Sequence, residues 1–262
     1  MKRSVKTALL LSCALILLGA ALFTGAAVYM GFDLTKASMT PLLATNTYDV
    51  TEAFTSIYVN GGECSVKLLP SDDDTCKVVI LETKKIHHTV KVTDGTLSIN
   101  RWDDRNWLDH LGLYLYPLEV TIYLPQKEFD SLDIKVASGN IDMAADFSFQ
   151  NIRLSSSSGT IELRNISCEE LTANVISGSI LISDCYADTV DLKATSGYIG
   201  LFNSDGRNIT MKTVSGNINA NLQSGKTFDV HTTSGSIIVP PDSSTDTCTA
   251  TTVSGTIYIT VE

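Results

Sequence analysis

Residues 131–262 repeat one pattern of apolar and polar positions seven times, with a spacing of 19 or 20 residues. Each unit has apolar residues at every second position, then a Ser-Gly pair, then a second alternating run. Alternation with a period of two predicts a β-strand with one buried face. The pattern therefore predicts two strands per unit, joined at a corner.

Two columns of identical residues define the repeat. Because glycine adopts positive φ without a steric penalty, we expect it to form each corner. When the units stack, the isoleucine two positions after each glycine should form a buried ladder. The corner glycines are Gly139, Gly159, Gly178, Gly197, Gly216, Gly235 and Gly255. The ladder isoleucines are Ile141, Ile161, Ile180, Ile199, Ile218, Ile237 and Ile257.

This repetition predicts an all-β fold, a parallel β-solenoid (β-helix) of about seven 19-residue coils over residues 131–262. A β-sandwich is the alternative, but its hairpins do not require a fixed period. Successive coils are expected to lie on one another, and the last coil is expected to have an open edge that another chain can pair with.

Residues 48–130 contain less regular alternating runs and are expected to form an irregular N-terminal β cap and the first irregular coils. Asn60-Gly61-Gly62 and Thr93-Asp94-Gly95 are turn signals between these runs. Residues 71–74 form an acidic segment that lacks the spaced ligands of a calcium loop, which favours a solvated turn. Residues 101–110 contain both tryptophans of the chain. We expect this segment to fold onto the core, and the alternative is that it contacts a partner or the bilayer surface.

The N-terminal part of the chain predicts a membrane anchor. Residues 7–32 form a segment without a charged residue that is long enough for one transmembrane helix. A cleaved signal peptide and a lipoprotein anchored through Cys13 are the alternatives. Basic residues in the segment 1–6 predict a cytoplasmic N-terminus and therefore an extracytoplasmic body in the cell envelope. Residues 33–47 have no clear period and are expected to be a linker.

Charge argues against one class of partner. The formal net charge of the chain is −10. An acidic body is unsuited to neutralising phosphates, so we expect no nucleic-acid binding. Outward columns of the repeats combine both signs, as in Asp133 with Lys135, and predict weak pairs on a solvated face, with a ligand-binding face as the alternative.

The six cysteines do not have the spacing of a metal site, and we expect no metal and no cofactor. Cys64 with Cys76 and Cys168 with Cys185 are candidate disulfides whose pairing the sequence leaves open. Cys248 lies in an inward column, which favours a buried thiol.

No catalytic motif accompanies the four histidines or the Ser-Gly pairs, and we expect a protein that is not an enzyme. The alternative is a carbohydrate-active enzyme on a β-helix scaffold. Its candidate carboxylates are the outward Asp133, Asp191 and Asp229, which share a column but are separated by repeats with Arg or Thr.

The repeated motif L-x-I-x-x-x-S-G-x-I-x-[LIVM], the preceding stretch LEVTIYLPQKEFDSLDIKVASGNIDM and the single anchor resemble the bacterial putative-adhesin family. That family is a β-strand-repeat domain of unknown function that includes LiaG-like membrane proteins of Gram-positive bacteria. The resemblance covers about residues 48–262 and transfers no catalytic residue. It implies a cell-envelope protein that displays a rigid solenoid for adhesion or for interaction with a protein or glycan. An accessory regulator in envelope-stress signalling is the alternative.

Overall fold

The structure is a computed structural model that describes residues 3–29, 31, 42–107 and 118–262. Two compact units divide the chain, Met1–Leu42 with Arg105–Tyr116 and Leu43–Asp104 with Pro117–Glu262. The first unit contains helix α1 (Arg3–Tyr29). Its stretch Leu11–Tyr29 has a mean hydropathy of 2.2 and is long and apolar enough to cross a membrane. Most of the expected linker, and residues 108–110 of the tryptophan segment, lie outside the described residues.

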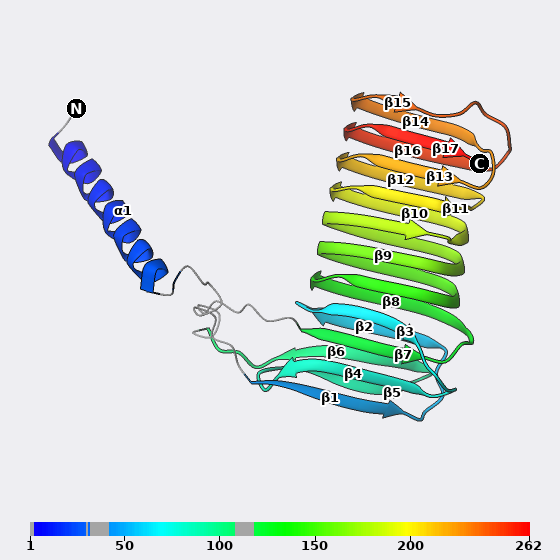
Figure 1. Cartoon of the computed structure of the whole chain (residues 1–262), viewed down its shortest axis with the longest axis horizontal. Helices are drawn as coiled ribbons and strands as arrows, with labels where there is room; N and C mark the ends of the chain where they lie inside the picture. The colour runs from blue at the N-terminus through cyan, green and yellow to red at the C-terminus, as the bar shows by residue number, and fades with distance from the viewer. Residues whose placement is uncertain (1–2, 30, 32–41, 108–117) are drawn as a thin grey trace. The chain divides into compact units, whose positions relative to one another are not determined.

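The second unit is built from strands that wind in layers (Figure 1). Its strands are β1 (Leu43–Val50), β2 (Ser56–Gly62), β3 (Ser65–Pro70), β4 (Cys76–Thr83), β5 (Ile86–Thr93), β6 (Thr96–Asp103), β7 (Glu119–Leu124), β8 (Glu128–Ser138), β9 (Ile141–Ser183), β10 (Tyr186–Ser196), β11 (Ile199–Ser204), β12 (Asn208–Ser215), β13 (Ile218–Leu222), β14 (Thr227–Ser234), β15 (Ile237–Ile238), β16 (Thr247–Ser254) and β17 (Ile257–Val261). The fold is therefore all-β with one N-terminal apolar helix.

Neighbouring layers pair as parallel strands in the register of the sequence repeat. Ile199 pairs with Ile180 on one side and with Ile218 on the other. Six of the seven ladder isoleucines have no exposed surface, while Ile237 in β15 is 40% exposed. These apolar columns form the inside of the stack, and the polar columns between them face water.

The order of the layers differs from the order of the repeats at both ends of the stack. Strand β12 pairs with β16, and β16 pairs with β14, so the last repeat lies between the two repeats before it. At the other end, β2 lies between β6 and β8, and β3 lies between β7 and β9. The expectation that the last coil has the open edge is therefore wrong, since β14 and β15 form the end layer.

Antiparallel strands close the stack at its N-terminal end. Strand β4 pairs with β7 and β1, and β5 pairs with β6 in a hairpin whose turn residues Asp94 and Gly95 both have positive φ. Strand β1 begins at Leu43 and so includes residues that the sequence pattern assigns to the linker. Its alternation is weak and most of its side chains are exposed, which is why the apolar pattern does not mark it as a strand.

Close approach between layers explains the corner glycines. A Cβ atom on Gly178 would lie 2.0 Å from the carbonyl oxygen of Gly159, and the φ of Gly178 is +143°. The φ of Gly197 lies outside the positive region that favours glycine, yet a Cβ there would lie 1.6 Å from the carbonyl oxygen of Gly178. Side chains are thus excluded mainly by the backbone of the neighbouring layer.

Candidate functional site

The outward carboxylates predicted from sequence do not form a paired site. Asp191 and Asp229 are separated along their column by Thr210 and Thr249. Three strand steps correspond to roughly 14 Å, which exceeds the 5–9.5 Å that separates the two carboxyls of glycosidases. Each of these acids instead contacts a basic residue two positions along its own strand, with Asp191 Oδ2 2.5 Å from Lys193 Nζ.

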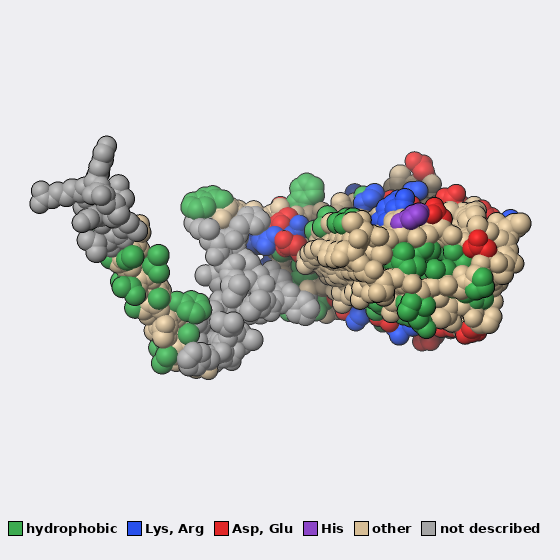
Figure 2. Space-filling model, turned by 90° about the horizontal axis from the view of Figure 1, so that it is seen from above, with side chains coloured by type: hydrophobic (Ala, Val, Ile, Leu, Met, Phe, Trp, Pro, Cys, Tyr) green, Lys and Arg blue, Asp and Glu red, His purple; other side chains and the backbone are tan. Residues whose placement is uncertain are grey.

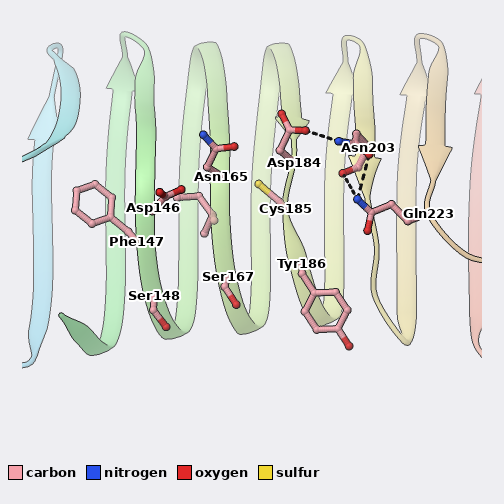
Figure 3. A pocket seen from close by; sticks show the side chains of 11 residues that line it. Asp146, Phe147, Ser148, Asn165, Ser167, Asp184, Cys185, Tyr186, Asn203 and Gln223 are labelled. Atoms are coloured by element: carbon pink, nitrogen blue, oxygen red, sulfur yellow. Dashed lines mark hydrogen bonds between the residues drawn. The ribbon is translucent and has the colours of Figure 1, made fainter. Parts of the chain in front are cut away.

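A groove of about 460 Å³ crosses several layers of the stack (Figure 3). Its polar lining includes Asp146, Asn165, Asp184, Asn203 and Gln223, which come from five successive repeats. Strands in such a stack are about 4.8 Å apart, so these side chains form a regular row.

Backbone geometry selects the residues of this row. Asn165, Asp184 and Asn203 have φ values of 56°, 54° and 46°. Asparagine and aspartate tolerate this left-handed conformation better than other residues with side chains. The local turn therefore accounts for the residue type, and the stacking of the turns lines the groove with polar groups.

Hydrogen bonds connect one half of the row and leave the other half open. The Asn203 amide nitrogen donates to Asp184 Oδ1, and Gln223 Nε2 donates to Asn203 Oδ1 at 3.1 Å. Figure 3 shows no hydrogen bond from Asp146 or Asn165 to the other labelled side chains. Asp146 and Asn165 can therefore bind a ligand without breaking a hydrogen bond within the row.

The floor and rim of the groove add one aromatic ring and a buried thiol. Tyr186 at the start of β10 is 48% exposed. Cys185 is buried, and burial raises the pKa of its thiol to about 11, so it is not a thiolate nucleophile at neutral pH. The groove thus offers amide, carboxylate, hydroxyl and aromatic groups for binding, and no activated nucleophile.

Two groups of buried charges lie elsewhere in the stack. Lys226, before β14, has a fully buried side chain whose Nζ lies 2.6 Å from Asp205 Oδ1 and donates to Ser224 Oγ at 2.6 Å. Burial raises the pKa of Asp205, but the hydrogen bonds from Lys226, Ser224 and the Gly206 backbone together with the charge of Lys226 outweigh it, so the pKa is lowered. This lysine connects the segment before β14 to the loop before β12.

The second buried pair lies in the N-terminal cap. Glu82 Oε2 is 3.0 Å from Nδ1 of His88 and accepts the backbone N–H of His88 at 2.7 Å. Asn46 of β1 donates to the other carboxylate oxygen at 2.6 Å. Burial and the charge of Glu82 raise the pKa of Tyr48. These contacts tie β1 and the turn between β4 and β5 together.

The remaining sequence-derived candidates occupy separate places. All six cysteines are free thiols in the structure, and burial raises the pKa of Cys64, Cys76, Cys168 and Cys248 to about 12. Asp73 accepts hydrogen bonds from Thr75 and Ser71, which is the geometry of a turn. Trp102 and Trp107 are both exposed. Within the described part of the chain, no three His, Cys, Asp or Glu side chains are grouped to hold a metal ion.

The groove was missed by the sequence reasoning. A signal exists, because the residue six positions after the glycine is Asn165, Asp184 and Asn203 in three consecutive repeats. This column of Asn and Asp residues lies where each repeat turns, so it reads as turn chemistry and not as a binding site. Only the stacking shows that it forms one row.

Comparison with known proteins gives a family and several solved structures. The model of the family described as Toastrack DUF4097 matches residues 54–262. A putative adhesin from Parabacteroides distasonis ATCC 8503 is 16% identical, with 84% of this chain and 97% of that chain covered and a TM-score of 0.47. A putative adhesin from Bacteroides fragilis NCTC 9343 is 15% identical, with 85% and 100% covered and a TM-score of 0.39. A putative cell adhesion protein from Clostridium sporogenes ATCC 15579 is 12% identical, with 84% and 100% covered and a TM-score of 0.33. No curated protein sequence matches the chain.

Proposed function

The chain belongs to the Toastrack DUF4097 family, and on this premise we propose that it is a non-enzymatic cell-envelope protein that binds a glycan outside the membrane. Residues 7–32 anchor it with the N-terminus in the cytoplasm, and residues 33–42 connect the anchor to the body. Residues 131–262 form about seven coils of a parallel β-solenoid, with the seven glycines at its corners and six of the seven ladder isoleucines inside. Residues 43–104 and 118–130 form the cap and the first layers.

The groove is the observation that carries the binding function. Its polar side chains repeat at the spacing of the strands, and an exposed aromatic ring lies beside them. A polysaccharide presents hydroxyl groups at regular intervals and apolar faces of its rings. Amide and carboxylate groups in a row can hydrogen-bond such hydroxyls, while Tyr186 supplies an apolar surface for a ring.

Binding is tested with the full chain in detergent micelles and polysaccharide purified from the envelope. Tyr186→Ala should weaken binding about tenfold, which corresponds to roughly 1.4 kcal/mol for the loss of one aromatic contact. Tyr258→Ala is the matched control, because Tyr258 is 44% exposed on β17 and does not line the groove. Equal affinities of the two variants would refute binding in the groove.

The same material tests the enzymatic alternative. The non-enzymatic proposal expects no release of reducing ends during prolonged incubation with the polysaccharide. Turnover that disappears in Asp191→Asn or Asp229→Asn would overturn the proposal in favour of a carbohydrate-active enzyme. Binding of an envelope protein instead of a glycan, found by cross-linking in intact envelopes, would favour the accessory-regulator alternative.

Topology is tested separately. Protease added to intact spheroplasts should digest the strand stack, because the positively charged N-terminal segment favours the cytoplasmic side. A tag fused before Met1 should remain protected until the membrane is opened with detergent. Protection of the stack in intact spheroplasts would contradict the extracytoplasmic placement.

A further inference from the structure

The end layer formed by β14 and β15 is incompletely covered. Among the described residues, strand β14 pairs only with β16, and β15 pairs only with β17. In consequence the inward positions Phe228 and Val230 are only half-buried, and Ile237 of the ladder is exposed. Figure 2 looks onto this end of the stack and shows hydrophobic side chains at the surface beside acidic, basic and histidine side chains. Such an edge is a template for another strand.

The backbone of β14 shows which of its groups are free. Thr227 donates its N–H to the carbonyl of Asp246 on the β16 side, whereas Phe228 donates its N–H to the Asp242 carboxylate at 2.9 Å. Backbone groups of successive strand residues point to alternate sides. The N–H and C=O groups of Val230 and Thr232 therefore point away from β16, toward the open edge.

The side chains of the same strand are complementary to a second copy. Outward-facing Asp229 and His231 flank Val230 and form an ion pair with each other at 2.8 Å. If two copies of β14 run antiparallel with Val230 opposite Val230, Asp229 of each copy lies opposite His231 of the other. This register also keeps the half-buried residues of both strands on the same face.

From the free edge and this charge pattern we propose that the chain forms a two-fold symmetric dimer through β14. Val230 exchanges both backbone hydrogen bonds with Val230 of the other copy. Asp229 and His231 then form a non-hydrogen-bonded cross-strand pair, where side chains approach most closely. The Thr232 N–H donates to the Phe228 carbonyl of the other copy, and the Asp242 contact to Phe228 is kept. The two stacks become one continuous sheet.

Sedimentation of the full chain in detergent micelles tests the dimer. The natural chain should sediment as a dimer at micromolar concentration. Val230→Pro should be monomeric with an unchanged far-UV spectrum, because proline removes an N–H that points outward and is tolerated on an edge strand. A natural chain that is monomeric up to about 100 µM, far weaker than a specific dimer requires, would overturn the proposal. So would a dimer that persists in Val230→Pro.

A charge exchange tests the register without altering the backbone. Asp229→Lys should dissociate the dimer, because lysine then lies opposite His231 of the other copy. Asp229→Lys combined with His231→Asp should restore it, since opposite charges face each other again. If the double variant stays monomeric, or if the single variant remains dimeric, the proposed register is wrong and the proposal falls with it.

Discussion

The buried ion pair of Lys226 gives the sharpest test of how this stack is stabilised. Lys226→Met keeps the length of the side chain but leaves the Asp205 carboxylate, 2.6 Å from Nζ, without its partner. Removing one partner of a buried pair typically costs about 3–5 kcal/mol. The Asp205 side chain is 13% exposed and keeps some hydration, so we expect the lower end of that range, about 3 kcal/mol.

The control is the same substitution at an exposed pair. Lys193 Nζ lies 2.5 Å from Asp191 Oδ2, but its side chain is 48% exposed. Lys193→Met should therefore change the free energy of unfolding by about 1 kcal/mol or less. Urea denaturation followed by circular dichroism measures both variants under the same conditions. Losses that are equal within about 0.5 kcal/mol would refute the reasoning, because the Lys226 side chain is fully buried and also contacts Ser224 and Asp246, whereas the Lys193 side chain is 48% exposed.

The same pair gives a dependence on pH. The pKa of Asp205 is lowered in the folded state, so the unfolded chain binds its proton more readily. Its stabilising contribution is fully present above the unfolded pKa of about 3.9 and is lost as pH falls through the folded pKa. Lys226→Met should remove this contribution, and the stability of the variant should fall less steeply below pH 4 than that of the natural chain.

Three further outcomes follow from the layers and the thiols. Ile199→Asp should destabilise the chain by more than about 4 kcal/mol in urea denaturation, against about 1 kcal/mol for Lys193→Asp, and similar losses would contradict the inward position of the ladder. Gly178→Ala should lower the free energy of unfolding by about 1–3 kcal/mol more than Gly95→Ala. Both glycines have positive φ, but only a Cβ on Gly178 would meet a backbone oxygen. Equal melting temperatures of the two variants would argue against the close approach of the layers. Cys168, whose pKa burial raises to about 12, should resist iodoacetamide at pH 8 and react after urea is added, and prompt labelling of the native chain would contradict its burial.

The repeat pattern predicts the local structure of the stack well, for a clear physical reason. Alternation places Ile180, Ile199 and Ile218 inside, and identical periods place them in one register. The membrane-length helix follows equally from uninterrupted apolar composition. In both cases the prediction rests on the local order of apolar and polar residues and does not require knowledge of distant neighbours.

The order of the layers could not be predicted, because the columns are degenerate. Thr210 can stack on Thr249 or on Asp229, because the flanking inward residues are apolar in both strands, and only the first pairing occurs. The short segment between Leu222 and Thr227 passes the layer that β16 and β17 fill, and the loop from Val239 to Asp246 returns the chain to that layer. The two prolines of this loop mark a break without indicating which layer the next strand joins. The groove could not be predicted either, because turn geometry accounts for its Asn and Asp residues and only the stacking of the layers brings them together.

The displaced last repeat has a consequence for how the chain reaches its native state. Residues 227–238 are synthesised before residues 247–261, yet their native neighbour is the later segment. The repeated columns would let β14 pair with β12 while β16 is still missing. We expect a chain stopped after Pro240 to have this pairing, so that the native end forms only when β16 enters between the two strands.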